Sequence, residues 1–252
     1  MGMRRLISLC REFGFDPIRT HKAIMGFHHY VFDLVRYRLK SKNEKILLSP
    51  ILGDFNAEAG SADGHYFWQD LICAQWINQE NPANHLDVGS RVDGFIAHLL
   101  ASREVTLVDV RPLTAEISNL KIEIGNAQEK LVEKIGLFRS VSSLHCIEHF
   151  GLGRYKDSLD PQGHYKGLQN ISECVETGGN LYLSFPIGLN ETQFNAQRLI
   201  NPHDVMKKLG SFDLERILVI PWKGSPKLVD ALNDIDLSVK LQAVLLKLRR
   251  KT

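Results

Sequence analysis

Cysteine is scarce in this sequence, and the few cysteines present are not paired. The 252 residues include four, Cys10, Cys73, Cys146 and Cys174, and no two of them form a C-x-x-C motif. This scattered set is typical of reduced thiols in the cytosol. A chain of this length buries roughly 75% of its unfolded surface, so it needs no disulfide cross-links.

An excess of charge and a long apolar run are also lacking. Lysine and arginine number 31 against 29 acidic residues, a net charge of +2, so we expect no nucleic-acid partner. No stretch reaches the roughly 20 apolar residues of a membrane-spanning helix, so we expect no membrane insertion. In residues 1–15, Arg11 and Glu12 interrupt the apolar run that a signal peptide would need, which favours a cytoplasmic location.

The composition that remains is that of a soluble globular protein. Apolar residues make up 44% and charged residues 24%, which excludes disorder, collagen and coiled coil. Within residues 1–40, apolar positions such as Tyr30 and Leu34 recur about one helical turn apart, and the polar run 41–45 follows them. We therefore expect an N-terminal helical segment at residues 1–45 and one larger domain at 46–252, which includes a helix at about 65–78.

From His85 onward, short apolar runs alternate with segments long enough to form helices. This alternation is typical of a parallel sheet with helical crossovers. It predicts an α/β fold with a doubly wound, Rossmann-like sheet of about seven strands and an N-terminal helical appendage. The expected strands are His85–Val88, Val105–Val108, Lys121–Ile124, Phe138–Leu144, Leu181–Phe185 and Leu214–Ile220, with Val239–Leu248 as the last.

The last of these segments permits two interpretations. As a helix, residues 239–251 would be basic and amphipathic, which is typical of a membrane-surface anchor. As a strand, they alternate up to Val244 and are apolar on both faces beyond it. That change is expected where a strand enters the interior of a sheet. We favour the strand, which leaves the basic residues 249–251 in solvent.

Polar or small residues follow three successive strands of the expected sheet. Gly89 follows the first strand, Asp109 ends the second and lies 20 residues beyond Gly89, and Asn126 follows the third. Ligands of open α/β sheets bind beyond the carboxyl ends of the strands, and an acid at this spacing can accept hydrogen bonds from a ribose. Each residue alone could be a tight turn or a helix cap. Arg91 and Asp93 stand where a dinucleotide loop needs glycine, which favours a nucleoside without phosphates over NAD.

Five stretches of the chain carry a resemblance to a known family. They are residues 64–71 (GHYFWQDL), 87–95 (DVGSRVDGF), 108–113 (VDVRPL), 143–155 (SLHCIEHFGLGRY) and 178–186 (GGNLYLSFP). With them the sequence resembles the class I S-adenosylmethionine-dependent methyltransferases and, more closely, a methyltransferase-like family, domain of unknown function family 268. The resemblance extends from residue 50 to about residue 210.

The resemblance implies a cofactor, a strand order and a set of site residues. The cofactor would be S-adenosylmethionine, and the last strand would run antiparallel beside the sixth. The wider pattern has glycine where this chain has Arg91, so we expect that side chain to turn outward or to pair with Asp87 or Asp93. The implied cofactor-binding residues are Asp87, Gly89 and Ser90 after the first strand, Asp109 on the ribose, Asn126 beside the adenine, and Ser143.

Residues 145–149 read His-Cys-Ile-Glu-His, which fits the H-x-x-E-H signature of inverted zinc peptidases. That chemistry needs both histidines on one helix, whereas here a strand leads into His145 and glycines follow at once, so we expect no metal. We predict instead that Glu148 and His149 lie on a loop facing the cleft as catalytic residues, where a histidine could take a proton from an acceptor. The alternative is that both only position the loop.

Four further residues are candidates for substrate binding. His65 and Tyr66 could close over the cofactor or acceptor, or could belong to a helix packed on the sheet. Arg154 and Tyr155 could bind an anionic acceptor, or could lie in a solvated loop. The leading hypothesis is a methyltransferase acting on a small molecule or glycan precursor. The alternative is a catalytically silent Rossmann-like module that binds a nucleoside or a protein; a nicotinamide enzyme is disfavoured.

Overall fold

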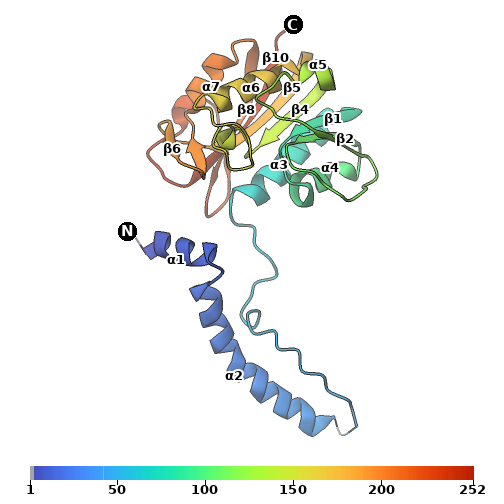
Figure 1. The fold of residues 1–252 in the computed structure, drawn as a ribbon, viewed down its shortest axis with the longest axis vertical. Helices are drawn as coiled ribbons and strands as arrows, with labels where there is room; N and C mark the ends of the chain where they lie inside the picture. Colours follow the sequence, from blue (N-terminus) through green and yellow to red (C-terminus); the bar gives the residue numbers. More distant parts are fainter. Residues whose placement is uncertain (1–2, 42) are drawn as a thin grey trace. The chain divides into compact units, whose positions relative to one another are not determined.

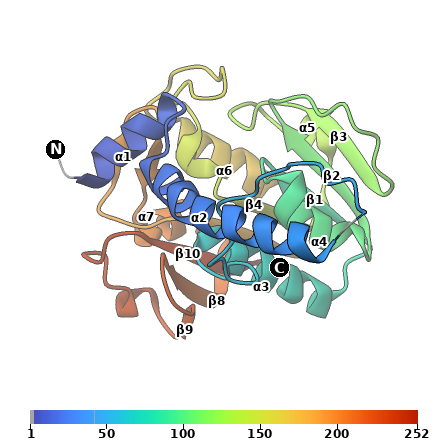
Figure 2. The same cartoon turned by 90° about the horizontal axis from the view of Figure 1, so that it is seen from below.

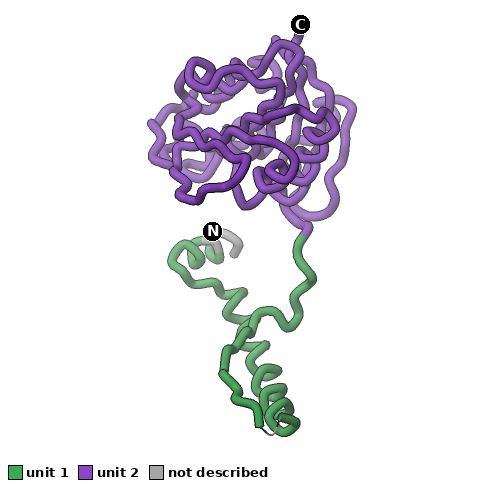
Figure 3. Tube along the Cα trace, turned by 90° about the vertical axis from the view of Figure 1, so that its right-hand side faces the viewer, with its two compact units in different colours: residues 1–61 green, residues 62–252 purple. Residues whose placement is uncertain are grey.

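The computed structural model describes residues 3–41 and 43–252. The chain divides into two compact units, residues 1–61 and residues 62–252, which we call the N-terminal unit and the sheet unit (Figure 3). The expected domain boundary between residues 45 and 46 falls within the first of these and stays a prediction.

The N-terminal unit consists of two helices and an extended segment (Figure 1). Helix α1 is Met3–Glu12 and helix α2 is Pro17–Lys40. Asp16 caps α2, because its carboxylate accepts hydrogen bonds from the backbone N–H groups of Ile18 and Arg19 at 3.0 and 3.1 Å. The expected helical character of residues 1–40 is thereby confirmed for the residues described. None of the described helices has the length and apolar character needed to cross a membrane.

The sheet unit is built on eight strands in the order β3-β2-β1-β4-β5-β10-β8-β9. The first five of these pair in parallel, and β10 is antiparallel to both β5 and β8. The doubly wound sheet and the antiparallel last strand are therefore confirmed. The strands are β1 Asn84–Val88, β2 Glu104–Asp109, β3 Leu120–Ile124, β4 Phe138–Leu144, β5 Val175–Pro186, β8 Phe212–Pro221, β9 Lys227–Val229 and β10 Gln242–Arg250.

Helices cover both faces of this sheet (Figure 2). On one face, α3 (His65–Glu80), η1 (Val92–Ile96) and α4 (Ala97–Leu100) pack in a cluster with Leu107 and Tyr182. On the other, α6 (Gly163–Glu173) and α7 (Pro202–Lys208) pack in a cluster with Leu181 and Leu183. Successive residues of β5 thus enter different cores, which is why the strand is mostly apolar over residues 181–185.

Some connections differ from the expected alternation of strands and helices. Residues 110–119 join β2 to β3 without a helix, and α5 (Val132–Ile135) is a single turn. Strands β6 (Glu191–Gln193) and β7 (Gln197–Leu199) form a separate hairpin after β5. Two short 3-10 helices, η2 (Ile147–His149) and η3 (Leu232–Asp234), complete the set.

The C-terminal segment is a strand, as expected, and its interpretation as a helix was wrong. Arg249 and Arg250 were expected in solvent, but they belong to this strand and are partly buried. Strand β10 lies between β5 and β8 and pairs with both along most of its length. Its side chains from Ala243 to Leu248 are buried, including Lys247, whose ammonium contacts Glu80 and Glu215. Burial on both faces explains the continuous apolar character beyond Val244.

Candidate functional site

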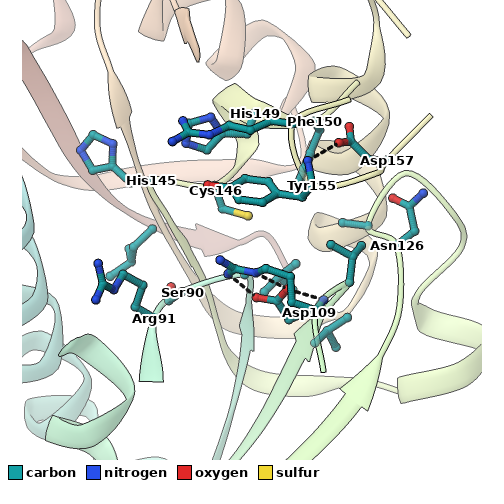
Figure 4. A pocket seen from close by; sticks show the side chains of 18 of the residues that line it. Ser90, Arg91, Asp109, Asn126, His145, Cys146, His149, Phe150, Tyr155 and Asp157 are labelled. Carbon is teal, nitrogen blue, oxygen red and sulfur yellow. Dashed lines mark hydrogen bonds and ion pairs between the residues drawn. The ribbon is translucent and has the colours of Figure 1, made fainter. Parts of the chain in front are cut away.

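The main cavity of the sheet unit lies at the carboxyl ends of the parallel strands (Figure 4). Its volume is about 450 Å³, within the range of roughly 300–1,000 Å³ that is typical of small-molecule sites. In Figure 4, Ser90 and Asp109 lie along one side of the cavity, and His149, Phe150 and Tyr155 lie along the other. The strand ends that the sequence singled out contribute Gly89 and Ser90 after β1, Asp109 in β2 and Asn126 after β3.

Asp87, at the end of β1, supports the cavity from behind. Its side chain is fully buried and does not line the cavity. The carboxylate accepts hydrogen bonds from the backbone N–H and the hydroxyl of Ser90 at 2.9 and 2.8 Å, and from the hydroxyl of Ser142. Burial raises the pKa of Asp87 to about 7. Asp87 therefore holds the loop that carries Gly89 and Ser90.

This burial predicts a pH dependence of stability. The pKa of Asp87 is higher in the folded protein, about 7, than in the unfolded chain, so the folded state holds an extra proton between about pH 4 and 7. The free energy of unfolding contributed by Asp87 is therefore largest at low pH and is lost as the pH rises towards 7. Relative to that of Asp87→Asn, the free energy of unfolding of the native protein should fall by at most about 1.4 kcal/mol per pH unit in that window.

Urea unfolding at pH 4, 5, 6, 7 and 8 measures this difference. The matched control is Asp93→Asn, an exposed acid whose pKa is lowered by Arg91, so its removal should not reproduce the slope. Parallel stability curves for the native protein and Asp87→Asn would contradict the assignment of a retained proton to Asp87.

Gly89 occupies a backbone conformation and a space that other residues do not fit. Its φ angle is +81°, and a Cβ atom there would lie 2.1 Å from the sulfur of Cys146. The glycine thus brings the loop after β1 against the loop after β4, and its N–H donates to the carbonyl of Val108 at 2.9 Å. The tight turn considered for Gly89 is present, at the wall of the cavity.

Asp109 lines the cavity but is engaged by a neighbour on its own loop. Its two carboxylate oxygens accept hydrogen bonds from the guanidinium of Arg111 at 2.9 and 2.6 Å, and one oxygen also accepts from the Arg111 backbone N–H at 2.8 Å. The Asp109 side chain is 10% exposed and that of Arg111 is 46% exposed. Arg111 also lies over the ring of Tyr155, so it links the two sides of the cavity.

The remaining two predicted cofactor residues take different positions. Asn126 lines the cavity, and its Oδ1 accepts from the backbone N–H of Gln128 at 3.0 Å. Ser143 is buried in β4 and donates to the carbonyl of Val88 at 3.0 Å. Ser143 is not among the residues that line the cavity; like Asp87, it supports the strand ends from behind.

The loop after β4 carries a buried histidine–carboxylate pair that the sequence analysis did not single out. His145 lines the cavity in a left-handed conformation (φ +47°), and its Nδ1 lies 2.8 Å from the carboxylate of Glu148. The side chains are 5% and 0% exposed. A carboxylate oxygen accepts here, so Nδ1 donates, and Nε2 is left without a hydrogen-bond partner among the described residues. The sequence signal for this pair was the spacing of three residues between His145 and Glu148 in the H-x-x-E-H motif.

Glu148 and His149 make different hydrogen bonds within η2, although the Glu148 carboxylate lies 3.8 Å from Nε2 of His149. His149 faces the cleft as expected, whereas Glu148 is fully buried and turns towards His145 instead of the cavity. His149 donates from Nδ1 to the carbonyl of Ala196 at 2.7 Å, which leaves Nε2 as the acceptor of a neutral ring. Burial lowers the pKa of His149 and favours that neutral form. No three His, Cys, Asp or Glu side chains within residues 3–41 and 43–252 are placed to hold a metal.

Three of the four predicted substrate residues line the cavity, and one does not. Tyr66, Arg154 and Tyr155 are on its wall. His65 is buried behind them, stacked on His145 with ring centres 5.3 Å apart, and burial lowers its pKa to about 4. Residues 65–71 of the motif 64–71 form the first part of α3. The motif therefore both packs on the sheet and contributes to the wall of the cavity.

Helix α3 contributes an acid that the sequence analysis missed. Asp70 lines the cavity one turn after Tyr66, and burial raises its pKa to about 6. The spacing of four residues, which places both side chains on one helix face, was the signal that could have found it.

The side chain of Arg91 is directed as expected. Its guanidinium forms an ion pair with Asp93 at 2.6 Å, and both side chains are about 70% exposed. Arg91 thus stands at the rim of the cavity, with its charge paired.

Comparisons with known proteins agree with the fold. The family model described as "Caenorhabditis protein of unknown function, DUF268" matches residues 109–214, and no curated protein matches the sequence. The N-methyltransferase NodS from Bradyrhizobium japonicum, solved with S-adenosyl-L-homocysteine, is similar with a TM-score of 0.53 and 12% identity, over 75% of this chain and 90% of that chain. A candidate methyltransferase from Bacillus halodurans gives 0.50 and 14%, over 73% and 99%.

At these identities the structural likeness shows the fold alone. The family match lies on the segment from Asp109 to Leu214, which includes the loop after β4. The resemblance to family DUF268 is therefore confirmed over residues 109–214, and the chain has the Rossmann-like fold of the class I S-adenosylmethionine-dependent methyltransferases.

Proposed function

We propose that the protein is an S-adenosylmethionine-dependent methyltransferase that acts on a small-molecule acceptor. The observation that carries this proposal is the cavity itself, which joins the ends of four neighbouring parallel strands, with Gly89 and Asp109 on successive strands. This is the edge of an open α/β sheet at which nucleoside ligands bind. A solved structure of similar fold, NodS, contains S-adenosyl-L-homocysteine, which supports the same class of ligand here.

The residues present fit such a ligand. The cavity volume of about 450 Å³ suits a nucleoside with an amino-acid arm. At Gly89 the protein backbone can approach the ligand closely. The Asp109 carboxylate is suited to the two ribose hydroxyls, and Asn126 can meet the adenine edge. When bound, S-adenosylmethionine supplies an electrophilic methyl group.

The chain's own residues then align the acceptor and remove its proton. Transfer of a methyl group to a hydroxyl or amine is an in-line displacement, so alignment of the two reactants supplies much of the rate. His149 offers a neutral Nε2 at the cavity wall to receive the acceptor proton. Glu148 acts through the loop, because it holds His145. Tyr66, Arg154 and Tyr155 provide the surface on which the acceptor rests.

A cytoplasmic location forms part of the proposal. All four cysteines, Cys10, Cys73, Cys146 and Cys174, are free, which is typical of a reducing compartment.

The ion pair on Asp109 leads to a specific expectation. A ribose diol must compete with Arg111 for the same carboxylate oxygens. Arg111 is half exposed, and ion pairs that water reaches are worth about 0.2–1 kcal/mol. Arg111→Ala should therefore strengthen binding of S-adenosylhomocysteine, by at most about fivefold, as measured by titration calorimetry. Arg139→Ala is the matched control, because Arg139 is exposed and does not line the cavity. Weaker binding by Arg111→Ala would mean that Arg111 contacts the ligand itself.

Turnover tests the proposed activity. The protein is incubated with S-adenosylmethionine carrying a labelled methyl group and a panel of sugars, sugar phosphates, phenols and amines, and the release of S-adenosylhomocysteine is followed. We expect release that depends on one chemical class of acceptor. Ligand binding without transfer to any of these classes would favour the catalytically silent module.

A further inference from the structure

The N-terminal unit exposes an apolar stripe along α2. Ile24, Phe27, Val31 and Val35 follow one another at spacings of three or four residues, so they share one face of the helix. Their exposed fractions lie between 42% and 59%. Leu6 and Leu9 of α1 are exposed to a similar degree. A contiguous apolar surface of this kind on a soluble protein marks a site of interaction.

The unit's own packing uses a different side of α2. The segment after the helix returns alongside it (Figure 3), and its Leu52 carbonyl lies so close to Gly26 that a Cβ atom there would be 2.0 Å away. Nearby, the rings of His29 and Phe55 stack with centres 3.8 Å apart. At 100° per residue, Gly26 and His29 lie on the side of α2 opposite the stripe. Ile24, Phe27 and Val31 are therefore no part of this unit's core, whereas Val35 lines a hollow together with residues 44–46 and 48.

The segment that contains these two helices carries a larger net positive charge than the whole chain, +5 against +2. Residues 1–40 contain eight Lys and Arg against three Asp and Glu, whereas the chain as a whole is nearly balanced at 31 against 29. Within the described part of the chain, Lys22, Arg36 and Lys40 form no ion pair with a carboxylate. At 100° per residue, these cations lie on the side of α2 away from the stripe, so the helix has an apolar face and a basic face.

We propose that α1 and α2 form a peripheral membrane anchor that lies on an anionic lipid surface. Helices with an apolar face and a Lys/Arg-rich polar face bind in the plane of the interface, with the apolar face at the acyl boundary and the cations near the phosphates. Charge complementarity selects this occupant over a second copy of the chain, because a second copy would bring the same positive charge against itself. The anchor does not span the bilayer, since no described helix can do so.

Vesicle flotation of the full chain tests the proposal. Vesicles of phosphatidylcholine alone are compared with vesicles in which about a third of the lipid is phosphatidylglycerol, at about 0.1 M and about 1 M salt, where charges are screened over roughly 10 and 3 Å. We expect binding to the anionic vesicles at low salt, weaker binding at high salt, and little binding to the neutral ones. Absence of binding to anionic vesicles overturns the proposal.

Two pairs of variants test the two parts of the surface. Phe27→Gln with Val31→Gln removes apolar contacts, and we expect it to weaken binding at least about tenfold. Its matched control is Phe194→Gln with Leu228→Gln, two exposed apolar residues of the sheet unit. Lys22→Gln with Arg36→Gln should weaken binding about 30-fold at low salt. Its control is Lys223→Gln with Lys227→Gln, both exposed.

These substitutions replace exposed side chains, so circular dichroism should show unchanged helix content. Vesicle binding that is equal in the variants and in their controls overturns the proposal. A second outcome also overturns the proposal: the native chain fails to bind anionic vesicles, and Phe27→Gln/Val31→Gln reduces its self-association. The stripe would then be an interface between copies of the chain.

Discussion

Replacing Asp109 by alanine is expected to weaken the binding of S-adenosylhomocysteine about 10- to 150-fold while the protein stays folded. The carboxylate lies on the cavity wall at the end of β2. Hydrogen bonds from a ribose diol to a carboxylate are charge-assisted and worth about 1.5–3 kcal/mol. Arg111 already occupies both oxygens, and this competition places the expected loss towards the lower end of the range. Titration calorimetry with the purified protein measures it.

Two controls distinguish a role in binding from a general disturbance of the loop. Asp93→Ala removes an exposed acid after β1 that pairs with Arg91, and its affinity should match that of the native protein. The double variant Asp109→Ala/Arg111→Ala should bind as Asp109→Ala does, because Arg111 is expected to act only through Asp109. Unchanged affinity in Asp109→Ala would show that Asp109 does not bind the ribose. It would also show that its spacing of 20 residues from Gly89 does not mark a ribose-binding acid.

Deleting residues 239–252 is expected to leave the protein insoluble or unfolded. Strand β10 lies between β5 and β8 and hydrogen-bonds to both, and its side chains from Ala243 to Leu246 are fully buried. Its removal would open two long strand edges and expose both cores. Losses of buried Leu or Ile side chains cost about 2–5 kcal/mol each, so several together exceed the typical 5–15 kcal/mol stability of a domain.

The matched control removes only Lys251 and Thr252, which are exposed and lie beyond β10. This shorter deletion should leave solubility and the circular dichroism spectrum unchanged. A soluble 1–238 fragment with native strand content would show that β10 is dispensable to the sheet.

The strands of the sheet could be predicted because burial constrains them. Strand β5 is buried on both faces over residues 179–186 and is mostly apolar over 181–185, and β10 shows where alternation ends inside the sheet. The hairpin β6–β7 could not be found this way. All three residues of β6 are exposed, so no apolar pattern marks them, although the hairpin supplies the Ala196 carbonyl that orients His149.

The candidate site was predictable where it depends on strand ends and not where it depends on side-chain direction. Asp109 and Asn126 follow their strands and reach the cavity. Asp87 also ends a strand, but its side chain turns inward to the Ser90 loop. Glu148 and His149 are adjacent, and one turn of 3-10 helix directs them to different partners. Sequence spacing alone does not specify such directions.

The central claim is that the cavity at the carboxyl ends of β1 to β4 is a nucleoside site for S-adenosylmethionine. Its most direct test is calorimetric titration of the native protein with S-adenosylhomocysteine and, separately, with NAD. The account predicts one molecule of S-adenosylhomocysteine bound per chain and no heat of binding with NAD. Absence of binding by S-adenosylhomocysteine, or binding of NAD in its place, would contradict it.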